Sequence, residues 1–452
     1  MALLEWRNLM ARNRMLFSFL LLFSIVMAAC SPKASIVDSP EFDQTQNEFI
    51  EELDVEKIHS SLKELTKKPR VAGTNSEIRA AAFLTVQLQS EGYEVEVQPF
   101  DFEKYIMPES KSLVVEGFDG SFSPASFQYS VDGNTSGQLV DAGYGLKSDY
   151  KKIDVKGKIA LVAVDKTAFY ELVLLASEAG AKAILLYFPD ESESTNWTLG
   201  REHFEDFIPA LALTYDEGKK LLDFVKKGSP VNATVEIEGA RIEKLASQNI
   251  IATKKPTKVA DVNDDIILIG AHYDSVDKAP GASDNASGTA VVLELARMFK
   301  TLPTNKEIRF LFFGAEEEGL HGSKKYVSAM SKDEIKRSSA MFNLDMVGSA
   351  DAGNLAIQTL DGWDNIVTKA ASKANEELNG TSIETTFGDR SDHTPFHNAG
   401  IDAALFIYDP VEEWYHTPND TIEKLSKDRL LNVAKIISSS VFELTFSAIP
   451  EE

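Results

Sequence analysis

The second half of the chain is built from compact apolar runs separated by amphipathic stretches. The apolar runs lack the alternation of a half-exposed strand, which is typical of strands buried on both faces of a parallel sheet. These predicted strands are Ile266–Gly270, Ile308–Phe313, Ala340–Leu344 and Ala403–Tyr408. Helical apolar spacing separates and follows them, and the predicted helices are Thr289–Lys300, Lys324–Ser338, Ile366–Leu378 and Ser426–Phe446. This order predicts a three-layer α/β/α sandwich with a mostly parallel central sheet.

A helical pattern also occurs near the N-terminus. Apolar residues have helical spacing over Asn47–Lys67 and again in the stretch AAAFLTVQLQ, after which Gly92 stands where a helix would end. Tyr93–Val97 then alternates like a strand. We therefore assign residues 46–109 and 246–452 to one discontinuous domain.

The pattern between residues 110 and 245 is different. Short strand-like runs and turns dominate, as in SLVVEGF, GQLVDAGYG and GKIALVAV, with one helix-plus-strand unit, ELVLLASEAGAKAILLYF. No dense cluster of histidines and carboxylates occurs there. We predict a second, inserted, β-rich domain without chemistry of its own. Its pattern GQLVDAGYGLKSDY…DVKGKIALV…ASEAGAKAILLY resembles a protease-associated (PA) domain.

The first 29 residues have the pattern of a signal peptide. Three arginines precede the apolar run Met15–Met27, which is too short to span a bilayer as a mature helix and ends in two alanines before Cys30. Cys30 is the only cysteine, so no intramolecular disulfide can form. The stretch VMAACSPK resembles a bacterial lipobox, which implies that Cys30 is lipid-modified after cleavage. The alternative is a conventional signal peptide with an incidental cysteine.

This assignment predicts an exported cell-envelope lipoprotein that Cys30 anchors to a membrane, with residues 30–45 as a polar tether. Loss of residues 1–29 takes the net charge of the 452-residue chain from −24 to about −26, because that segment holds three arginines and one glutamate. So acidic a surface repels nucleic acid, which we exclude as a partner.

Histidines and carboxylates follow the predicted strands. In open α/β sheets, ligands bind outside the carboxyl ends of the strands. Asp284 adds one more carboxylate just before a predicted helix, where its alternative role is a helix N-cap. Carboxylates that converge without a cation would repel one another, so the set predicts a metal site. Its members are His272, Asp274, Asp284, Glu316, Glu317, Asp345 and His416.

The two histidines with only three of these five carboxylates already exceed the three protein ligands that one catalytic Zn²⁺ uses. If one carboxylate bridges, two ions receive three protein ligands each. The mixed imidazole and carboxylate set suits two Zn²⁺ per chain, with Co²⁺ or Mn²⁺ as alternatives.

Six motifs in order carry a specific resemblance: GAHYDS, GASDNASGTA, FFGAEEEGLHGS, FNLDMVGS, RSDHTPFHNAGI and WYHTPNDT. They are similar to the motifs of the zinc aminopeptidases of metallopeptidase family 28, which have a zinc-exopeptidase (phosphorylase/hydrolase-like) fold. The resemblance implies His272 and Asp345 on one zinc, Glu317 and His416 on the other, and Asp284 bridging. It also implies Glu316 as general base and a cis peptide bond between Asp284 and Asn285.

The expected reaction is attack on the scissile carbonyl by a water that bridges two zinc ions, with Glu316 taking its proton. Tyr415 is expected to donate a hydrogen bond to the developing oxyanion, since the family has a tyrosine there. Asp274 is expected to accept the N–H of His272, the alternative being a solvated carboxylate. Glu318 is expected at a helix start. His393 and His397 have metal-ligand spacing, but we interpret Arg390–His397 as pocket wall.

We therefore predict a metal-dependent exopeptidase, a hydrolase that releases N-terminal amino acids from peptides with a free N-terminus. Carboxypeptidase or dipeptidase activity on the same fold is the alternative, and a binding protein without catalysis is a second one. Glu316, Asp345 and the acidic loop Asp409–Glu413 are equally placed by sequence to bind the substrate ammonium.

Overall fold

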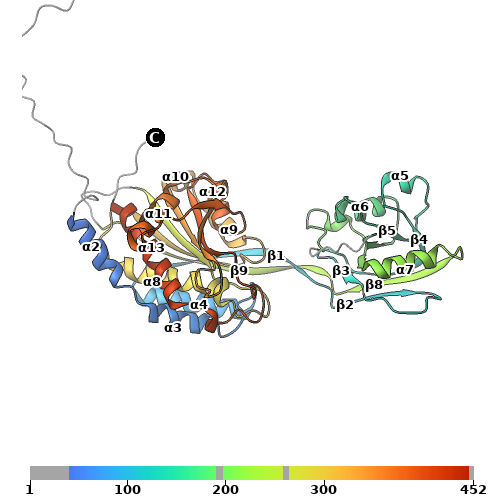
Figure 1. Cartoon of the computed structure of the whole chain (residues 1–452), viewed down its shortest axis with the longest axis horizontal. Coiled ribbons are helices and arrows are strands. Elements are labelled where there is room, and N and C mark those ends of the chain that lie inside the picture. The colour runs from blue at the N-terminus through green and yellow to red at the C-terminus, as the bar shows by residue number, and fades with distance from the viewer. Residues whose placement is uncertain (1–39, 190–196, 258–263, 447–452) are drawn as a thin grey trace, which may run out of the picture.

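The computed structural model describes residues 40–189, 197–257 and 264–446. The predicted signal peptide and Cys30 lie outside these residues. Within them, no helix is long and apolar enough to cross a membrane. Two sheets form, one with eight strands and one with seven. Figure 1 shows them as two bodies joined by the long strands β1 (Val95–Ile106) and β9 (Arg241–Lys254).

The larger sheet has the strand order β1-β9-β11-β10-β12-β15-β13-β14. Its four inner strands, β11, β10, β12 and β15, run parallel to one another, which confirms the four predicted strands. β9 pairs antiparallel with both β1 and β11, and β13 pairs antiparallel with β15. The bounds of the strands other than β1 and β9 are β10 (Ile266–His272), β11 (Glu307–Phe313), β12 (Ser338–Leu344), β13 (Asn354–Thr359), β14 (Thr385–Phe387) and β15 (Ala403–Asp409).

Helices cover both faces of this sheet. Alternate residues of β10 divide between two cores: Ile267 and Ile269 face one, and Ile266 and Leu268 face the other. The first core is closed by α3 (Val55–Leu65), α4 (Asn75–Ser90), α8 (Gly288–Thr301), α11 (Ile366–Asn379) and α13 (Lys427–Phe446). The second is closed by α9 (His321–Ala329), α10 (Lys332–Arg337) and α12 (His393–Asn398). The predicted α/β/α sandwich is confirmed.

Two predicted helices are each divided in the structure. The helix expected over Asn47–Lys67 is instead α2 (Pro40–Glu51) followed by α3, because Asp54 caps α3 by accepting the backbone N–H of Glu56 at 2.9 Å. The first residues of α2 were expected to belong to the tether. The helix expected over Lys324–Ser338 is likewise α9 and α10, since Ser331 and Glu334 form a capping box at the start of α10.

The smaller sheet has the order β2-β8-β4-β5-β6-β7-β3 and spans Ser110 to Glu238. The predicted helix-plus-strand unit is present as α6 (Phe169–Glu178) and β6 (Ala183–Tyr187). The other strands are β2 (Ser110–Val115), β3 (Ala125–Ser126), β4 (Gly133–Asp141), β5 (Ile159–Ala163), β7 (Ala210–Leu213) and β8 (Val231–Glu238). The other helices are α5 (Lys147–Tyr150) and α7 (Tyr215–Val225).

β1 and β9 form a two-stranded ribbon between the sheets. Their antiparallel register runs without a break from Val95 opposite Ala252 to Ile106 opposite Arg241. The near end of the ribbon belongs to the larger sheet, and the far end leads into the smaller one (Figure 1). The residues 241–245, expected in the inserted domain, thus pair in β9.

Candidate metal centre

The carboxyl ends of the inner strands bring the predicted residues to one edge of the larger sheet. β10 ends at His272, β11 leads into Glu316 and Glu317, and β12 leads into Asp345. His416 follows β15 after a short loop, and Asp284 lies in the irregular helical segment before α8. Because these strands are neighbours in the sheet, their ends converge.

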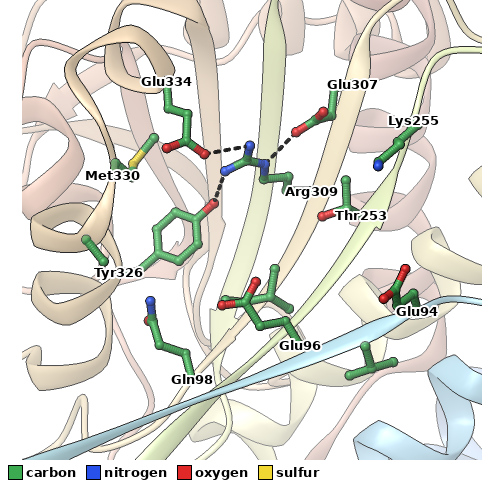
Figure 2. Close-up of a pocket in the computed structure, with 13 residues that line it drawn as sticks. Glu94, Glu96, Gln98, Thr253, Lys255, Glu307, Arg309, Tyr326, Met330 and Glu334 are labelled. Carbon is green, nitrogen blue, oxygen red and sulfur yellow. Dashed lines mark hydrogen bonds and ion pairs between the residues drawn. The ribbon is translucent and has the colours of Figure 1, made fainter.

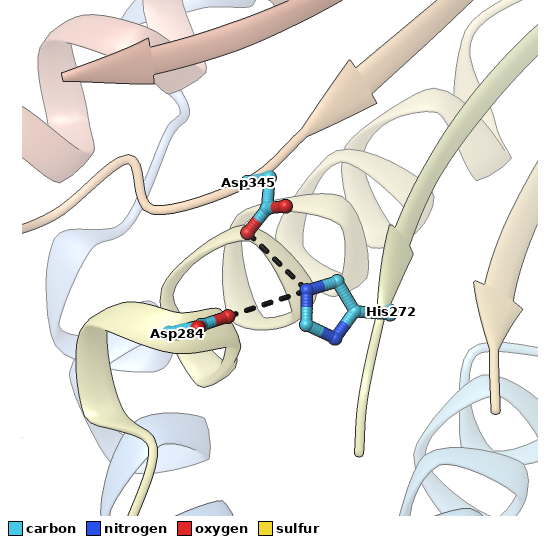
Figure 3. A group of neighbouring side chains, drawn as sticks. All are labelled: His272, Asp284 and Asp345. Carbon is cyan, nitrogen blue, oxygen red and sulfur yellow. Dashed lines mark hydrogen bonds and ion pairs between the residues drawn. The ribbon is translucent and has the colours of Figure 1, made fainter. Parts of the chain in front are cut away.

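Two groups of side chains form there, and Asp284 belongs to both. In the first, Nε2 of His272 lies 3.3 Å from Oδ1 of Asp284 and 3.3 Å from Oδ1 of Asp345 (Figure 3). In the second, Nε2 of His416 lies 3.0 Å from Oδ2 of Asp284 and 3.1 Å from Oε2 of Glu317. Within each group the potential ligand atoms all lie within 4.8 Å of one another. The peptide bond between Asp284 and Asn285 is cis.

The electrostatics of the two groups suit a cation. Burial raises the pKa of Glu317 to about 7, and the neighbouring Asp284 carboxylate adds to the rise. Burial also raises the pKa of Asp284, but hydrogen bonds with His272 and His416 outweigh it and hold the pKa below its usual range. Oε1 of Glu317 is buried and lacks a hydrogen-bond partner among the described residues. A bound cation would satisfy this atom and the converging charges together.

Glu316 belongs to neither group. Its carboxylate is buried, with 8% of the residue exposed, and its Oε2 lies 3.9 Å from Nε2 of His272. Burial raises the pKa of Glu316 well above its usual value, and Asp392, Asp345 and Glu317 add to the rise. A carboxylate with a raised pKa beside the ligand groups is suited to accept a proton.

Asp274 contacts the turn that follows β11. Its oxygens accept the backbone N–H groups of Glu316 at 3.1 Å and Glu317 at 3.2 Å. Its Oδ1 is 3.6 Å from Nδ1 of His272, which is longer than a hydrogen bond. Asp274 therefore lies close to His272, but its hydrogen bonds are to the backbone of the two glutamates and the expected hydrogen bond from His272 is not formed.

Tyr415 lies beside the second group. Its ring stacks on that of His416 with 3.7 Å between centroids, and 42% of the residue is exposed. Burial of the phenol raises its pKa, and the carboxylates of Asp284 and Glu317 raise it further, so the hydroxyl keeps its proton and can donate it in a hydrogen bond.

Glu318 is not at a helix start, because α9 begins three residues later at His321. Its carboxylate instead forms a partly buried ion pair with Lys104 of β1. The helix-start interpretation is therefore wrong. The cause is a partner 214 residues away in the sequence, which local pattern cannot reveal.

Three further residues support the site and were missed by sequence reasoning. Asp420 accepts the backbone N–H groups of Ser283 at 2.7 Å and Asp284 at 3.0 Å. The hydroxyl of Ser391 donates to Oδ2 of Asp345 at 2.8 Å. Asp420 and Ser391 stand inside the motifs WYHTPNDT and RSDHTPFHNAGI, which was the available signal.

Arg70 is the third of these residues and is 1% exposed. Its guanidinium donates to the carbonyls of Tyr273 at 2.6 Å and Gly281 at 2.8 Å, and also to those of Leu65 and Pro280. Burial lowers its pKa to about 10, against the attraction of nearby carboxylates. Arg70 thus ties the segment after β10 to the loop that carries Asp284.

A cleft of about 420 Å³ opens beside the two groups. Its apolar lining includes Met346, Leu405 and Ile407, and Arg390 is the one basic residue among the described lining residues. The carboxylates that line it are Asp284, Glu316, Glu317, Asp345, Asp389 and Asp409. His393 turns Nε2 toward the carbonyl of Gly388, at 2.8 Å, and belongs to neither group.

A larger groove, of about 760 Å³, lies elsewhere, over β1, β9 and β11. Figure 2 shows Arg309 there, donating hydrogen bonds to Glu307, Tyr326 and Glu334. The described residues that line this groove include no member of either group. Its size alone therefore does not make it the reaction site.

Comparison with known proteins gives two family matches in this chain. The model of peptidase family M28 matches residues 249–441, and the PA domain model matches residues 135–221. Aminopeptidase YwaD of Bacillus subtilis is 38% identical over 398 residues, which cover 85% of this chain and 84% of that protein. The chain belongs to peptidase family M28.

Solved aminopeptidase structures share the fold. The aminopeptidase from Aneurinibacillus sp. strain AM-1 is 44% identical, with a TM-score of 0.77 and coverage of 88% of this chain and 95% of that one. The zinc aminopeptidase BSAP from Bacillus subtilis is 36% identical, with a TM-score of 0.67 and coverage of 87% of this chain and 95% of that one.

A further sequence relative is the probable lipoprotein aminopeptidase LpqL of Mycobacterium tuberculosis. It is 27% identical, and the match covers 80% of this chain and 78% of that protein.

Proposed function

We propose that this M28 member is a zinc aminopeptidase that releases N-terminal amino acids from peptides. The observation that carries the proposal is the position of Asp284. Its Oδ1 lies 3.3 Å from Nε2 of His272, and its Oδ2 lies 3.0 Å from Nε2 of His416. A carboxylate between two histidines, each with a second carboxylate at hand, suits a pair of metal ions.

In this proposal His272, Asp284 and Asp345 hold one Zn²⁺, and Asp284, Glu317 and His416 hold the second. Three carboxylates against two divalent ions leave one positive charge, which suits a nucleophile that must lose a proton. Bound Zn²⁺ lowers the pKa of water and polarises a carbonyl. The unpartnered Oε1 of Glu317 supports this ligand set.

The remaining steps belong to side chains of the chain. Glu316 accepts the proton of the attacking water and then donates it to the leaving amine, because its carboxylate is beside the ligands without being one of them. Tyr415 donates a hydrogen bond to the oxyanion that develops on the scissile carbonyl. Asp274 holds the backbone of Glu316 and Glu317, and so fixes the base relative to the ligands.

The charge of the cleft favours an aminopeptidase over a carboxypeptidase. Apart from the three proposed zinc ligands, the carboxylates of Glu316, Asp389 and Asp409 line it against the single Arg390 among the described lining residues, which leaves the cleft with its ions net negative. An α-ammonium is attracted to such a cleft, whereas an α-carboxylate is repelled. The same argument disfavours a dipeptidase that must hold both termini of a short substrate.

We also propose that residues 46–109 and 246–452 form the peptidase domain around an inserted PA domain at 110–245. The likeness to LpqL supports a location in the cell envelope. The lipobox-like sequence at Cys30 supports an anchor there, after removal of residues 1–29.

A panel of aminoacyl-anilides and peptides, each with a free or an acetylated N-terminus, tests the proposal. We expect hydrolysis of the free forms only, and its loss after chelation. Equal rates on acetylated substrates would show that a free ammonium is not required and that the enzyme is not an aminopeptidase. Release of C-terminal residues instead would favour the carboxypeptidase alternative.

A further inference from the structure

We propose that the ribbon of β1 and β9 holds the catalytic turn in place, with Lys104 and Phe102 as positioning residues for Glu316 and Glu317. The catalytic turn is defined as residues 314–321, from the residue after β11 to the first residue of α9. The inference rests on the proposed function only for its catalytic consequence, because the contacts themselves are structural.

The catalytic turn has a backbone that needs support. Ala315 and Leu320 have positive φ angles of 53° and 60°, in the left-handed region that residues with side chains rarely adopt. The turn is closed by the backbone N–H groups of Gly319 and Leu320, which both donate to the carbonyl of Glu316 at 2.8 Å. Such a backbone persists where its surroundings hold it.

Asp274 supports one side of the turn, through its hydrogen bonds to the backbone of Glu316 and Glu317. Asp274 follows β10, so this support comes from the centre of the larger sheet. Asp274 contacts only two residues of the turn by these hydrogen bonds. The following three residues, Glu318 to Leu320, are held by other contacts.

The ribbon supports the other side. Nζ of Lys104 donates to Oε1 of Glu318, and these side chains are only 21% and 22% exposed. Phe102 is 3% exposed and packs against Ala315, and its ring centroid lies 5.4 Å from that of His321. The ribbon thus contacts the start, the middle and the end of the turn.

The same strand also contacts the inserted domain. Glu103, between the two positioning residues, pairs with Arg201 at 2.9 Å, and Arg201 precedes β7 of the smaller sheet. Consecutive residues of β1 therefore touch the PA domain and the catalytic turn. This gives the inserted domain a physical connection to the site, although none of the proposed ligands belongs to that domain.

Lys104→Met tests the inference, with Lys244→Met as the matched control. Lys244 pairs with Asp101 at 2.8 Å on the same ribbon, where the side chains are 71% and 59% exposed. The first readout is amide hydrogen exchange of the segment 314–321, in protein with and without zinc. We expect exchange about fivefold faster in Lys104→Met and unchanged in Lys244→Met.

The second readout is steady-state kinetics. We expect kcat to fall about tenfold in Lys104→Met with KM within twofold, because a displaced turn misplaces the base more than the bound substrate. Lys104→Arg should retain most activity. The reversed pair, Lys104→Glu with Glu318→Lys, should restore both slow exchange and turnover relative to Lys104→Glu alone.

Unchanged exchange of segment 314–321 in Lys104→Met would overturn the inference, whatever the kinetics. Equal effects of Lys104→Met and Lys244→Met would also overturn it, since the cause would then be general loosening of the ribbon. If the parent protein lacks aminopeptidase activity while exchange responds as expected, the proposed function fails and the positioning role stands.

Discussion

Asp420 accepts the backbone N–H of Asp284, with 3.0 Å between Oδ2 and the nitrogen. Its other oxygen accepts the N–H of Ser283 at 2.7 Å. The carboxylate proposed to bridge two ions is therefore positioned through its own backbone by a residue from a loop 136 positions later. Asp420 is 1% exposed, so these hydrogen bonds do not compete with bulk water.

The first prediction follows from this contact. Asp420→Asn keeps one acceptor oxygen but loses the other, so one backbone N–H of the loop is left without its partner. We expect zinc affinity to fall about tenfold or more, as for other residues that orient ligands. Competition with a chromophoric chelator measures this zinc affinity.

Asp402→Asn is the control for Asp420→Asn, since Asp402 accepts the backbone N–H of Ile366 at 3.2 Å outside both ligand groups. Equal affinity of all three proteins would contradict the role of Asp420.

The second prediction concerns the proposed base. Glu316→Gln keeps the size of the side chain but cannot accept the proton, so kcat should fall by about 10² or more. Zinc content by metal analysis should stay unchanged, because Glu316 is outside both ligand groups. Glu376→Gln, on the exposed side of α11, should behave like the parent. Full activity of Glu316→Gln would exclude this mechanism.

The third prediction concerns metal content. Dialysis against a chelator should abolish hydrolysis, and Zn²⁺ should restore it. His416→Ala removes a ligand of one group only, so zinc should fall to about one ion per chain, against about two in the parent. His397→Ala is the matched control, because His397 belongs to neither group. A single zinc in the parent, unaffected by His416→Ala, would show that the second group holds no metal.

The fourth prediction concerns stability against pH. Burial raises the pKa of Glu77 from 4.5 to about 8, although hydrogen bonds from Ser247 and from the backbone N–H of Gly73 oppose the rise. The folded pKa lies above the unfolded one, so the stabilisation is complete below pH 4.5 and is lost as the pH rises toward 8. Each unit of difference corresponds to about 1.4 kcal/mol.

Glu77→Gln removes this titration while keeping both hydrogen bonds, since an amide can accept from Gly73 and donate to the Ser247 hydroxyl. The melting temperature of the parent, relative to that of Glu77→Gln at equal zinc, should therefore fall between pH 5 and pH 8. A constant difference over this range would show that Glu77 does not titrate there.

Much of the site could be predicted because the ends of buried strands can be located from the sequence, where an apolar run stops. Runs such as Ile266–Gly270 and Ile308–Phe313 are apolar at every or nearly every position, and parallel topology then brings the residues after them to one edge. β13 and β14 could not be found in this way, because they are short and partly exposed.

The contacts of the supporting residues could not be predicted, although motifs contain some of these residues, for a different reason. Asp420 and Arg70 form hydrogen bonds with backbone groups. Because almost every residue type carries the same backbone N–H and C=O groups, the sequence does not show which residues will be their partners. Glu318 is a similar case, since its ion pair with Lys104 depends on where β1 lies in the folded sheet. The start of α10 was missed although the sequence contains a signal for it, the capping-box spacing of Ser331 and Glu334.

The ribbon determines how the inserted domain is joined to the enzyme. At its far end Ile106 lies opposite Arg241, so the chain leaves and returns on adjacent strands, about 5 Å apart. A tight two-residue turn could join these two positions and convert the ribbon into a hairpin without opening the larger sheet. Both connections to the inserted domain therefore lie at one place on the ribbon. The domain can be removed or exchanged there, and the ribbon can be lengthened, by a change at that single junction.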